Sequence, residues 1–206
     1  MKKNIIFDWS GVVKDAVKSH LWIVNKMFRD FGAGEISLEE LKENWKQPYM
    51  DFYNKYLPNL TIEEEQAVYK QIILDKDCPK SGAYPGIAEL IKKVKEKDNF
   101  LAVISSDLPD TVFPEIKSYG LENIFDEVIV NAHNKVKAAR GLIGKKNLNP
   151  NITFFIGDTN HEIEVGREIG IKTIAVTWGY NTEQKLKLEK PDFIVHNLNE
   201  LEKIIL

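Results

Sequence analysis

The chain has 206 residues, 43% of them hydrophobic, and its 28 basic and 31 acidic side chains nearly cancel to a formal charge of −3. This length is sufficient for one hydrophobic core that carries an inserted subdomain. The near balance of charge excludes the broad positive surface used in binding to nucleic acid or to an anionic membrane. We therefore expect a small-molecule partner, with no nucleic acid and no membrane.

The cysteine content and the first residues indicate the compartment. Cys78 is the only cysteine, so no intramolecular disulfide and no cysteine-rich zinc site can form. The apolar run at residues 5–7 meets Asp8 almost at once and is too short for a signal peptide or a membrane span. These features predict a cytoplasmic protein. The oligomeric state is left open between a monomer and a homodimer.

Helical spacing dominates the stretch that follows the first apolar run. From Val17 to Phe31, apolar residues recur every three or four positions, which predicts an amphipathic helix. The S/T-x-x-E pattern of a capping box begins at Ser37 and again at Thr61, so two further helices are expected. Residues 15–80 are therefore predicted to be helical and to contain no strand.

Strand-like apolar runs alternate with helical spacing in the rest of the chain. This alternation predicts an α/β fold with a doubly wound parallel sheet. The core domain would combine residues 1–14 and 81–206, and residues 15–80 would form a small inserted helical cap. The predicted strands cover residues 5–7, 100–105, 127–130, 152–158, 172–179 and 193–195, and the predicted helices contain residues 87–94, begin near Lys135, and pass through Ile163 and Ile169.

Polar side chains directly follow three of the predicted strands. Asp8, Ser105 and Asp158 stand at carboxyl ends of strands, where ligands bind in doubly wound sheets. Two carboxylates form a hard oxygen site suited to Mg²⁺, which also takes water and substrate phosphate as ligands. A serine hydroxyl and a lysine could hold phosphate oxygens and offset their charge, and an aspartate can attack phosphorus. The pattern indicates phosphoryl chemistry on a small phosphorylated metabolite.

Sequence motifs in this order resemble those of the haloacid dehalogenase superfamily. The segment FDWSGVV (residues 7–13) resembles the first motif, and IGDTNHEIEVGREIGI (156–171) resembles the fourth. VISS (103–106) looks like the second motif, and HNK (133–135) looks like the third. Together with TWGYN (177–181), the motifs span nearly all of the chain outside residues 15–80, where one subgroup of the family inserts a helical cap.

The resemblance implies a Mg²⁺-dependent phosphatase that works through an aspartyl phosphate, with the cap closing over the site. By this resemblance, Asp8 is the nucleophile and a metal ligand, Asp158 is a direct metal ligand, and Ser10 binds the metal through its backbone carbonyl. Ser105 binds phosphate, and Lys135 neutralises phosphate and orients the nucleophile. Glu162 is the second acidic group and reaches the metal through water.

Several of these assignments have competing interpretations. Lys137 competes with Lys135 for the role of the active-site lysine, and Ser106 follows Ser105 closely enough to share phosphate binding. Glu162 lies where the helix dipole alone favours an acid. His161 has no partner at metal-ligand spacing, so it is interpreted as a residue of the rim.

Position 10 departs from the family pattern. Phosphatases of the superfamily usually have an aspartate two residues after the nucleophile, where it protonates the leaving oxygen and activates water, but this chain has Ser10. Losing a positioned acid/base typically costs about 10²- to 10⁴-fold in rate. The alternatives are a phosphatase for good leaving groups, a carbon–phosphorus hydrolase, or a degenerate phosphate-binding or regulatory protein. The carbon–phosphorus branch has a similar D-W-small-G start, so Trp9 is a candidate substrate contact, and Lys46 is the candidate Schiff-base lysine.

Overall fold

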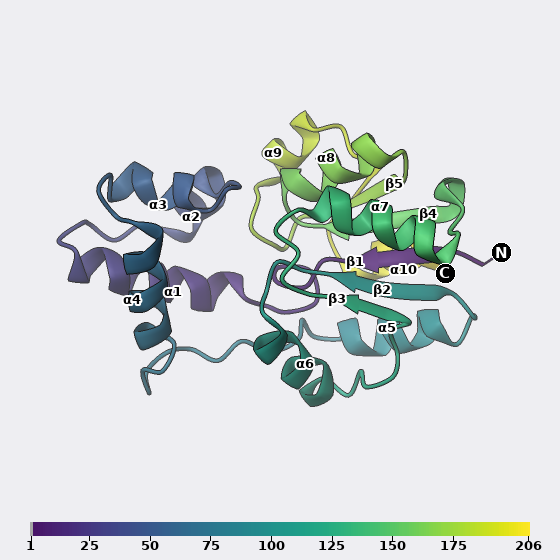
Figure 1. Ribbon diagram of the computed structural model, residues 1–206, viewed down its shortest axis with the longest axis horizontal. Coiled ribbons are helices and arrows are strands. Elements are labelled where there is room, and N and C mark those ends of the chain that lie inside the picture. Colours follow the sequence, from purple (N-terminus) through teal and green to yellow (C-terminus); the bar gives the residue numbers. More distant parts are fainter. Residues whose placement is uncertain (1) are drawn as a thin grey trace.

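The computed structural model describes residues 2–206, and within them a six-stranded parallel sheet has the order β3-β2-β1-β4-β5-β6. Figure 1 shows this sheet with helices on both of its faces and a separate group of helices beyond the carboxyl end of β1. The α/β fold with a doubly wound sheet is confirmed. The strands are β1 (Asn4–Phe7), β2 (Phe100–Ile104), β3 (Glu127–Ile129), β4 (Thr153–Gly157), β5 (Lys172–Val176) and β6 (Phe193–Val195).

The central strand is apolar on both sides because helices cover both faces of the sheet. Ile5 and Phe7 point to one face, and Ile6 points to the other, as the period of two in a strand requires. The first face packs against α5 (Ile87–Lys95), α6 (Pro109–Ser118) and α10 (Leu198–Ile205). The second face packs against α7 (Lys135–Lys146), α8 (Asn160–Ile169) and α9 (Glu183–Leu188). A short 3-10 helix, η1 (Pro150–Ile152), precedes β4.

The helices of the segment between β1 and α5 form a lobe with its own apolar core, here called the helical lobe. Phe28, Leu41, Phe52 and Tyr53 are buried in this core, which is separate from the apolar clusters on the two faces of the sheet. Tyr180, from the loop after β5, is the core-domain residue that joins this cluster. The helical lobe consists of α1 (Val17–Asp30), α2 (Leu38–Asn44), α3 (Met50–Tyr56) and α4 (Ile62–Ile72).

The two predicted capping boxes differ in detail. At Thr61 the reciprocal box is complete, since the hydroxyl accepts from the Glu64 amide and the Glu64 carboxylate accepts from the Thr61 amide. At Ser37 the hydroxyl accepts from the Glu40 amide, and the Glu40 carboxylate accepts instead from the Tyr56 hydroxyl. Both helices begin where the pattern places them. No helix within residues 2–206 combines the length and apolar character needed to span a membrane.

Candidate active site

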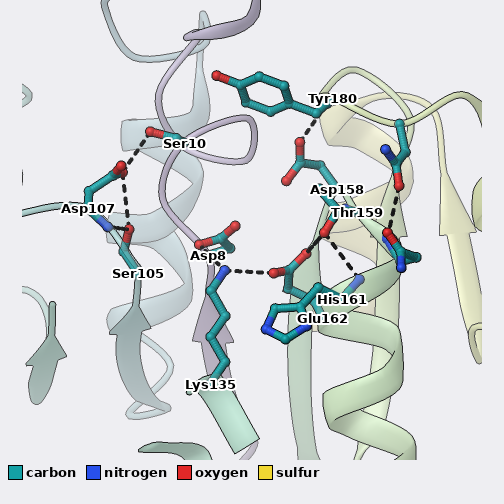
Figure 2. Close-up of polar contacts among 12 residues, drawn as sticks. Asp8, Ser10, Ser105, Asp107, Lys135, Asp158, Thr159, His161, Glu162 and Tyr180 are labelled. Carbon is teal, nitrogen blue, oxygen red and sulfur yellow. Dashed lines mark hydrogen bonds and ion pairs between the residues drawn. The ribbon is translucent and has the colours of Figure 1, made fainter. Parts of the chain in front are cut away.

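The residues predicted to carry the chemistry gather at one edge of the sheet. Asp8 follows β1, Ser105 follows β2 and Asp158 follows β4. Strand β1 lies between β2 and β4, where the order of the sheet reverses direction, which is the switch point at which such sheets bind ligands. Figure 2 shows the three side chains with Lys135 entering between them.

A buried lysine links two carboxylates at this edge. Lys135 Nζ lies 2.9 Å from Asp8 Oδ1 and 2.6 Å from Glu162 Oε1, and all three side chains are largely withdrawn from solvent. Burial raises the pKa of Asp8 to about 7, although the Lys135 charge opposes this change. Burial alone would lower the pKa of Lys135, but the charges of Asp8 and Glu162 outweigh it and raise that pKa. The lysine is thus fixed as a cation beside the proposed nucleophile.

Asp158 is fully buried and only partly satisfied. Its Oδ2 accepts from the Tyr180 backbone amide at 2.6 Å, whereas Oδ1 has no hydrogen-bond partner among the described residues. Burial, followed by the charges of Asp8 and Glu162, raises the pKa of Asp158 well above its ordinary value. Carboxylate oxygens of Asp8, Asp158 and Glu162 lie within 4.8 Å of one another. Such a crowded acidic set with an orphaned oxygen fits a hard divalent cation.

Two glycines make room for Asp158. Gly11, after β1, has φ +89°, a left-handed conformation, and a Cβ there would overlap the Asp158 carboxylate. A Cβ at Gly179, after β5, would overlap the same side chain. Loops from two other strands therefore enclose the Asp158 side chain, and larger side chains at either position would displace it.

Glu162 has two structural duties at the start of α8. Its Oε2 accepts from the Thr159 amide at 3.2 Å and from the Thr159 hydroxyl at 2.7 Å, which completes a capping box. Its Oε1 accepts from Lys135. Burial would raise the pKa of Glu162, but the Lys135 charge prevails and lowers it. In this structure Glu162 therefore caps α8 and binds Lys135, and its role at a metal stays a prediction.

A hydrogen-bonded trio lies on the other side of Asp8. Ser10 Oγ donates to Asp107 Oδ2 at 2.7 Å, and Ser105 Oγ donates to the same oxygen at 3.1 Å. The Asp107 amide returns a hydrogen bond to Ser105 Oγ at 3.0 Å. Figure 2 shows Asp107 reaching across from the loop after β2 to Ser10 in the loop after β1.

Asp107 was not among the residues predicted from the sequence. One signal was available: an acid two residues beyond Ser105, in a chain that lacks the usual acid at position 10. Its pairing with Ser10 depends on how the loop after β2 folds, which hydrophobic spacing does not specify.

The structure also separates the competing candidates. Lys137 is exposed in the first turn of α7, and its amide donates to the Asn134 side chain, so it is Lys135 that lies beside Asp8. Ser106 is half-buried directly after Ser105. His161 is partly exposed at the start of α8.

Two predicted substrate contacts lie away from the carboxylates. Trp9 is fully buried in the core, where its indole stacks on Tyr119 and donates to Glu115 Oε2 at 2.7 Å. Lys46 is 54% exposed in the helical lobe, and its Nζ lies 3.4 Å from Asp51 Oδ2. The structure does not bring either side chain to the Asp8 cluster.

Contacts between the helical lobe and the core domain adjoin the site. The Tyr180 ring stacks on Trp45, with ring centroids 5.1 Å apart, and its amide holds Asp158. Lys185 Nζ donates to the Trp45 carbonyl at 2.6 Å, and Lys42 Nζ donates to the Thr177 carbonyl at 3.3 Å. The lobe is thus attached to the loops that enclose the acidic cluster.

The fold and the site together define an α/β protein whose reactive groups meet at the switch point of a parallel sheet. The family model for haloacid dehalogenase-like hydrolases matches residues 5–176. The chain belongs to this family and is a hydrolase.

Similar proteins with assigned names extend over nearly the whole chain. A phosphoglycolate phosphatase from Synechococcus elongatus is 25% identical over 96% of this chain and 94% of its own length. The pyrophosphatase PpaX from Halalkalibacterium halodurans is 22% identical over 98% of this chain and 96% of its own. A structure from Streptococcus pneumoniae described as a haloacid dehalogenase-like hydrolase has a TM-score of 0.83 at 20% identity, covering 100% of this chain and 99% of that one.

Proposed function

We propose that this hydrolase is a Mg²⁺-dependent phosphatase that cleaves a small phosphomonoester through an aspartyl phosphate on Asp8. The observation that carries the proposal is the Asp8 carboxylate at the switch point, with Lys135 Nζ 2.9 Å away and Asp158 behind it. The names of the relatives, phosphoglycolate phosphatase and pyrophosphatase, support a phosphate-bearing substrate.

Each residue of the site has a role that its position supports. Asp8 attacks phosphorus with one carboxylate oxygen while the Lys135 ammonium fixes the other and offsets charge on the phosphoryl group. Ser105, at the end of the neighbouring strand, presents a hydroxyl to phosphate. The helical lobe acts as the cap, which closes over the site to exclude bulk water and to select the substrate.

The acidic cluster suits Mg²⁺ by the chemistry of its donors. Asp8 and Asp158 would hold the ion, and Asp158 Oδ1, which has no hydrogen-bond partner among the described residues, would be one of the ligand atoms. When bound, the cation supplies Lewis-acid stabilisation of the negative phosphoryl oxygens. Glu162, already bound to Lys135 and Thr159, would act outside the direct ligands.

The carbon–phosphorus alternative requires a lysine that reaches the substrate. Lys46 was the candidate for this role, and its exposed position beside Asp51 gives that alternative no support. The phosphatase is therefore the function that we test first.

Phosphate release should be measured from 2-phosphoglycolate, pyrophosphate, acetyl phosphate, p-nitrophenyl phosphate and phosphonoacetaldehyde, with Mg²⁺ and with EDTA. We expect Mg²⁺-dependent turnover of at least one phosphate compound and a loss of about 10⁴-fold or more in Asp8→Asn, because the nucleophile is removed. Acid-quenched wild type should carry a phosphoryl group on the peptide that contains Asp8. The exposed Asp98→Asn is the control and should match wild type. Equal rates in wild type and Asp8→Asn, or phosphate binding without turnover, would contradict the proposal.

A further inference from the structure

An aspartyl phosphate mechanism needs a group that moves protons, and this inference rests on the proposed function. Proton transfer is required twice: to the leaving oxygen when Asp8 attacks, and from the water that later cleaves the acyl phosphate. Residue 10 offers a hydroxyl, which cannot serve as a carboxylic acid does. A second residue must supply that chemistry if the enzyme turns over ordinary esters.

The buried ionisable groups nearest to Asp8 already have other partners or roles, so none of them is free to transfer protons to the substrate. Lys135 is paired with Asp8 and Glu162. Glu162 closes the capping box of α8 with its other oxygen. Asp158 accepts from the Tyr180 amide and belongs to the acidic cluster.

Asp107 lies on the opposite side of Asp8 from Asp158 and Glu162 (Figure 2). It is half-buried, and its Oδ2 accepts from Ser10 and Ser105, so the two strand-end loops hold the carboxylate in place. Ser10 is two residues after the nucleophile, so its hydroxyl places the Asp107 carboxylate close to the reacting centre.

Electrostatic effects on neighbouring groups support this position. Burial is the main reason that the pKa values of Asp8, Tyr69 and Tyr180 are raised, and the Asp107 charge contributes to all three. Asp8 belongs to the sheet edge, Tyr69 to α4 of the helical lobe, and Tyr180 to the loop after β5. The Asp107 carboxylate is therefore close enough to groups of the sheet edge, the helical lobe and the loop after β5 to affect their protonation.

We propose that Asp107 is the catalytic acid/base of this enzyme, supplied from the loop after β2, and that Ser10 is a positioning residue that holds it. In the first step Asp8 Oδ bonds to phosphorus, the bond from phosphorus to the leaving oxygen breaks, and that oxygen takes the proton of the Asp107 carboxyl group. In the second step water bonds to phosphorus, the bond to Asp8 breaks, and the Asp107 carboxylate takes the water proton. Phosphate and the alcohol are released, and Asp107 is protonated again for the next turnover.

The test separates the two steps in Asp107→Asn, which keeps the shape of the side chain and an oxygen that can accept from Ser10. With p-nitrophenyl phosphate, whose leaving group needs no acid, we expect a burst of nitrophenol equal to the enzyme present. The steady state should then be slower by about 10²- to 10⁴-fold, and the phosphoryl group on Asp8 should accumulate. With an alkyl ester such as 2-phosphoglycolate we expect the burst itself to be lost, because the first step also needs the proton.

Two further variants complete the experiment. Asp110→Asn changes an exposed acid in the first turn of α6, the helix that follows the loop of Asp107, and should behave as wild type. Ser10→Asp in the Asp107→Asn background returns a carboxylate to the same place and should recover at least tenfold of the lost rate. Wild-type kcat and no burst in Asp107→Asn would overturn the role of Asp107 while the Asp8 mechanism stands. Wild-type turnover that does not depend on Asp8 would instead overturn the proposed function and this role with it.

Discussion

Asp8 is the residue at which protonation would compete with the proposed metal binding. Its pKa is raised from 3.8 to about 7, first by burial, so the folded chain holds this proton more tightly than the unfolded chain does. The stability that follows is fully present below pH 3.8 and is lost as the pH rises through about 7. A bound cation favours the ionised form, so it restores stability where the metal-free protein has lost it.

We predict from this that Mg²⁺ binds about tenfold more weakly at pH 6 than at pH 8, because a group with a pKa near 7 is mostly protonated at the lower pH. Isothermal titration calorimetry at the two pH values measures the difference. In EDTA, the melting temperature of wild type should fall from pH 5 to pH 8 more than that of Asp8→Asn, which cannot ionise. Mg²⁺ affinity that is the same at both pH values would count against a raised Asp8 pKa.

Individual residues of the site were predictable to different extents. Asp8, Ser105, Lys135 and Asp158 each follow a strand or begin a helix in a recognisable motif, and the structure brings them to one edge. Their catalytic roles stay predictions until the variants are measured. Asp107 was not predictable from its own motif, because its importance arises from contact with a loop almost a hundred residues away in the chain.

Trp9 shows the opposite problem. Its place beside Asp8 suggested a substrate contact, yet successive residues after a strand can point in opposite directions. The indole turns into the core to meet Tyr119 and Glu115. The motif specified the backbone position of Trp9 but not the direction of its side chain.

At the scale of elements, the start of α8 combines helix capping with the active site. The Thr159 hydroxyl accepts from the His161 amide at 3.2 Å and donates to Glu162 Oε2 at 2.7 Å. The same Glu162 carboxylate binds Lys135. The helix terminus therefore also fixes the lysine that faces Asp8.

Replacing Thr159 by valine keeps the shape and removes the cap. We expect Thr159→Val to lower the free energy of unfolding by about 1 kcal/mol, or roughly 2–4 °C in melting temperature. The kcat should fall as well, because Glu162 loses the bond that orients it toward Lys135. Thr159→Ser, which retains the hydroxyl, should keep both values near wild type. Denaturant unfolding and steady-state kinetics give the answer, and a valine variant as stable and active as wild type would show that the cap does neither job.

Elements with strong periodicity were predicted well, and short ones were not. The strands were predicted because each is a compact apolar run between polar turns. Helices α3, α6, α9 and α10 were not predicted as separate elements. For α10 a signal existed, since Asn197 caps the Glu200 amide and Leu201 and Ile205 lie on one face. For α9, six residues long, tertiary packing of Leu186 decides the helix, and a sequence pattern of that length carries little information.

For the whole molecule, the attachment of the helical lobe to the core domain determines how the site is covered. The Trp45 carbonyl, just beyond α2, accepts from Lys185 at 2.6 Å and from the Asn181 side chain at 3.3 Å. The Trp45 ring stacks on Tyr180 and meets His20 edge-on, with centroids 4.8 Å apart. One tryptophan therefore gathers the polar and aromatic contacts of this junction.

Weakening this junction should loosen the lobe without altering the acidic cluster. We expect Lys185→Met to raise KM for the best substrate several-fold and to speed amide hydrogen exchange in α2, because the methionine cannot donate to the Trp45 carbonyl. Lys187→Met is the matched control, since Lys187 is exposed and pairs with Glu183 within the same helix. Exchange in α2 that is unchanged in Lys185→Met would show that this hydrogen bond does not hold the lobe.

The order of the strands also has a consequence for how the protein folds. Asn4 pairs with Phe100 in β2 and with Thr153 in β4, so the central strand acquires its neighbours only from distant parts of the chain. Pairings of such long range close large loops and are slow to form, whereas the helical lobe is built mainly from contacts within one segment, to which Tyr180 is added from the loop after β5. During synthesis the lobe can fold early, whereas the contact between Asp8 and Asp158 can form only after β4 has been synthesised. An incomplete chain therefore has no assembled acidic cluster, and the reactive centre appears only when the sheet is joined.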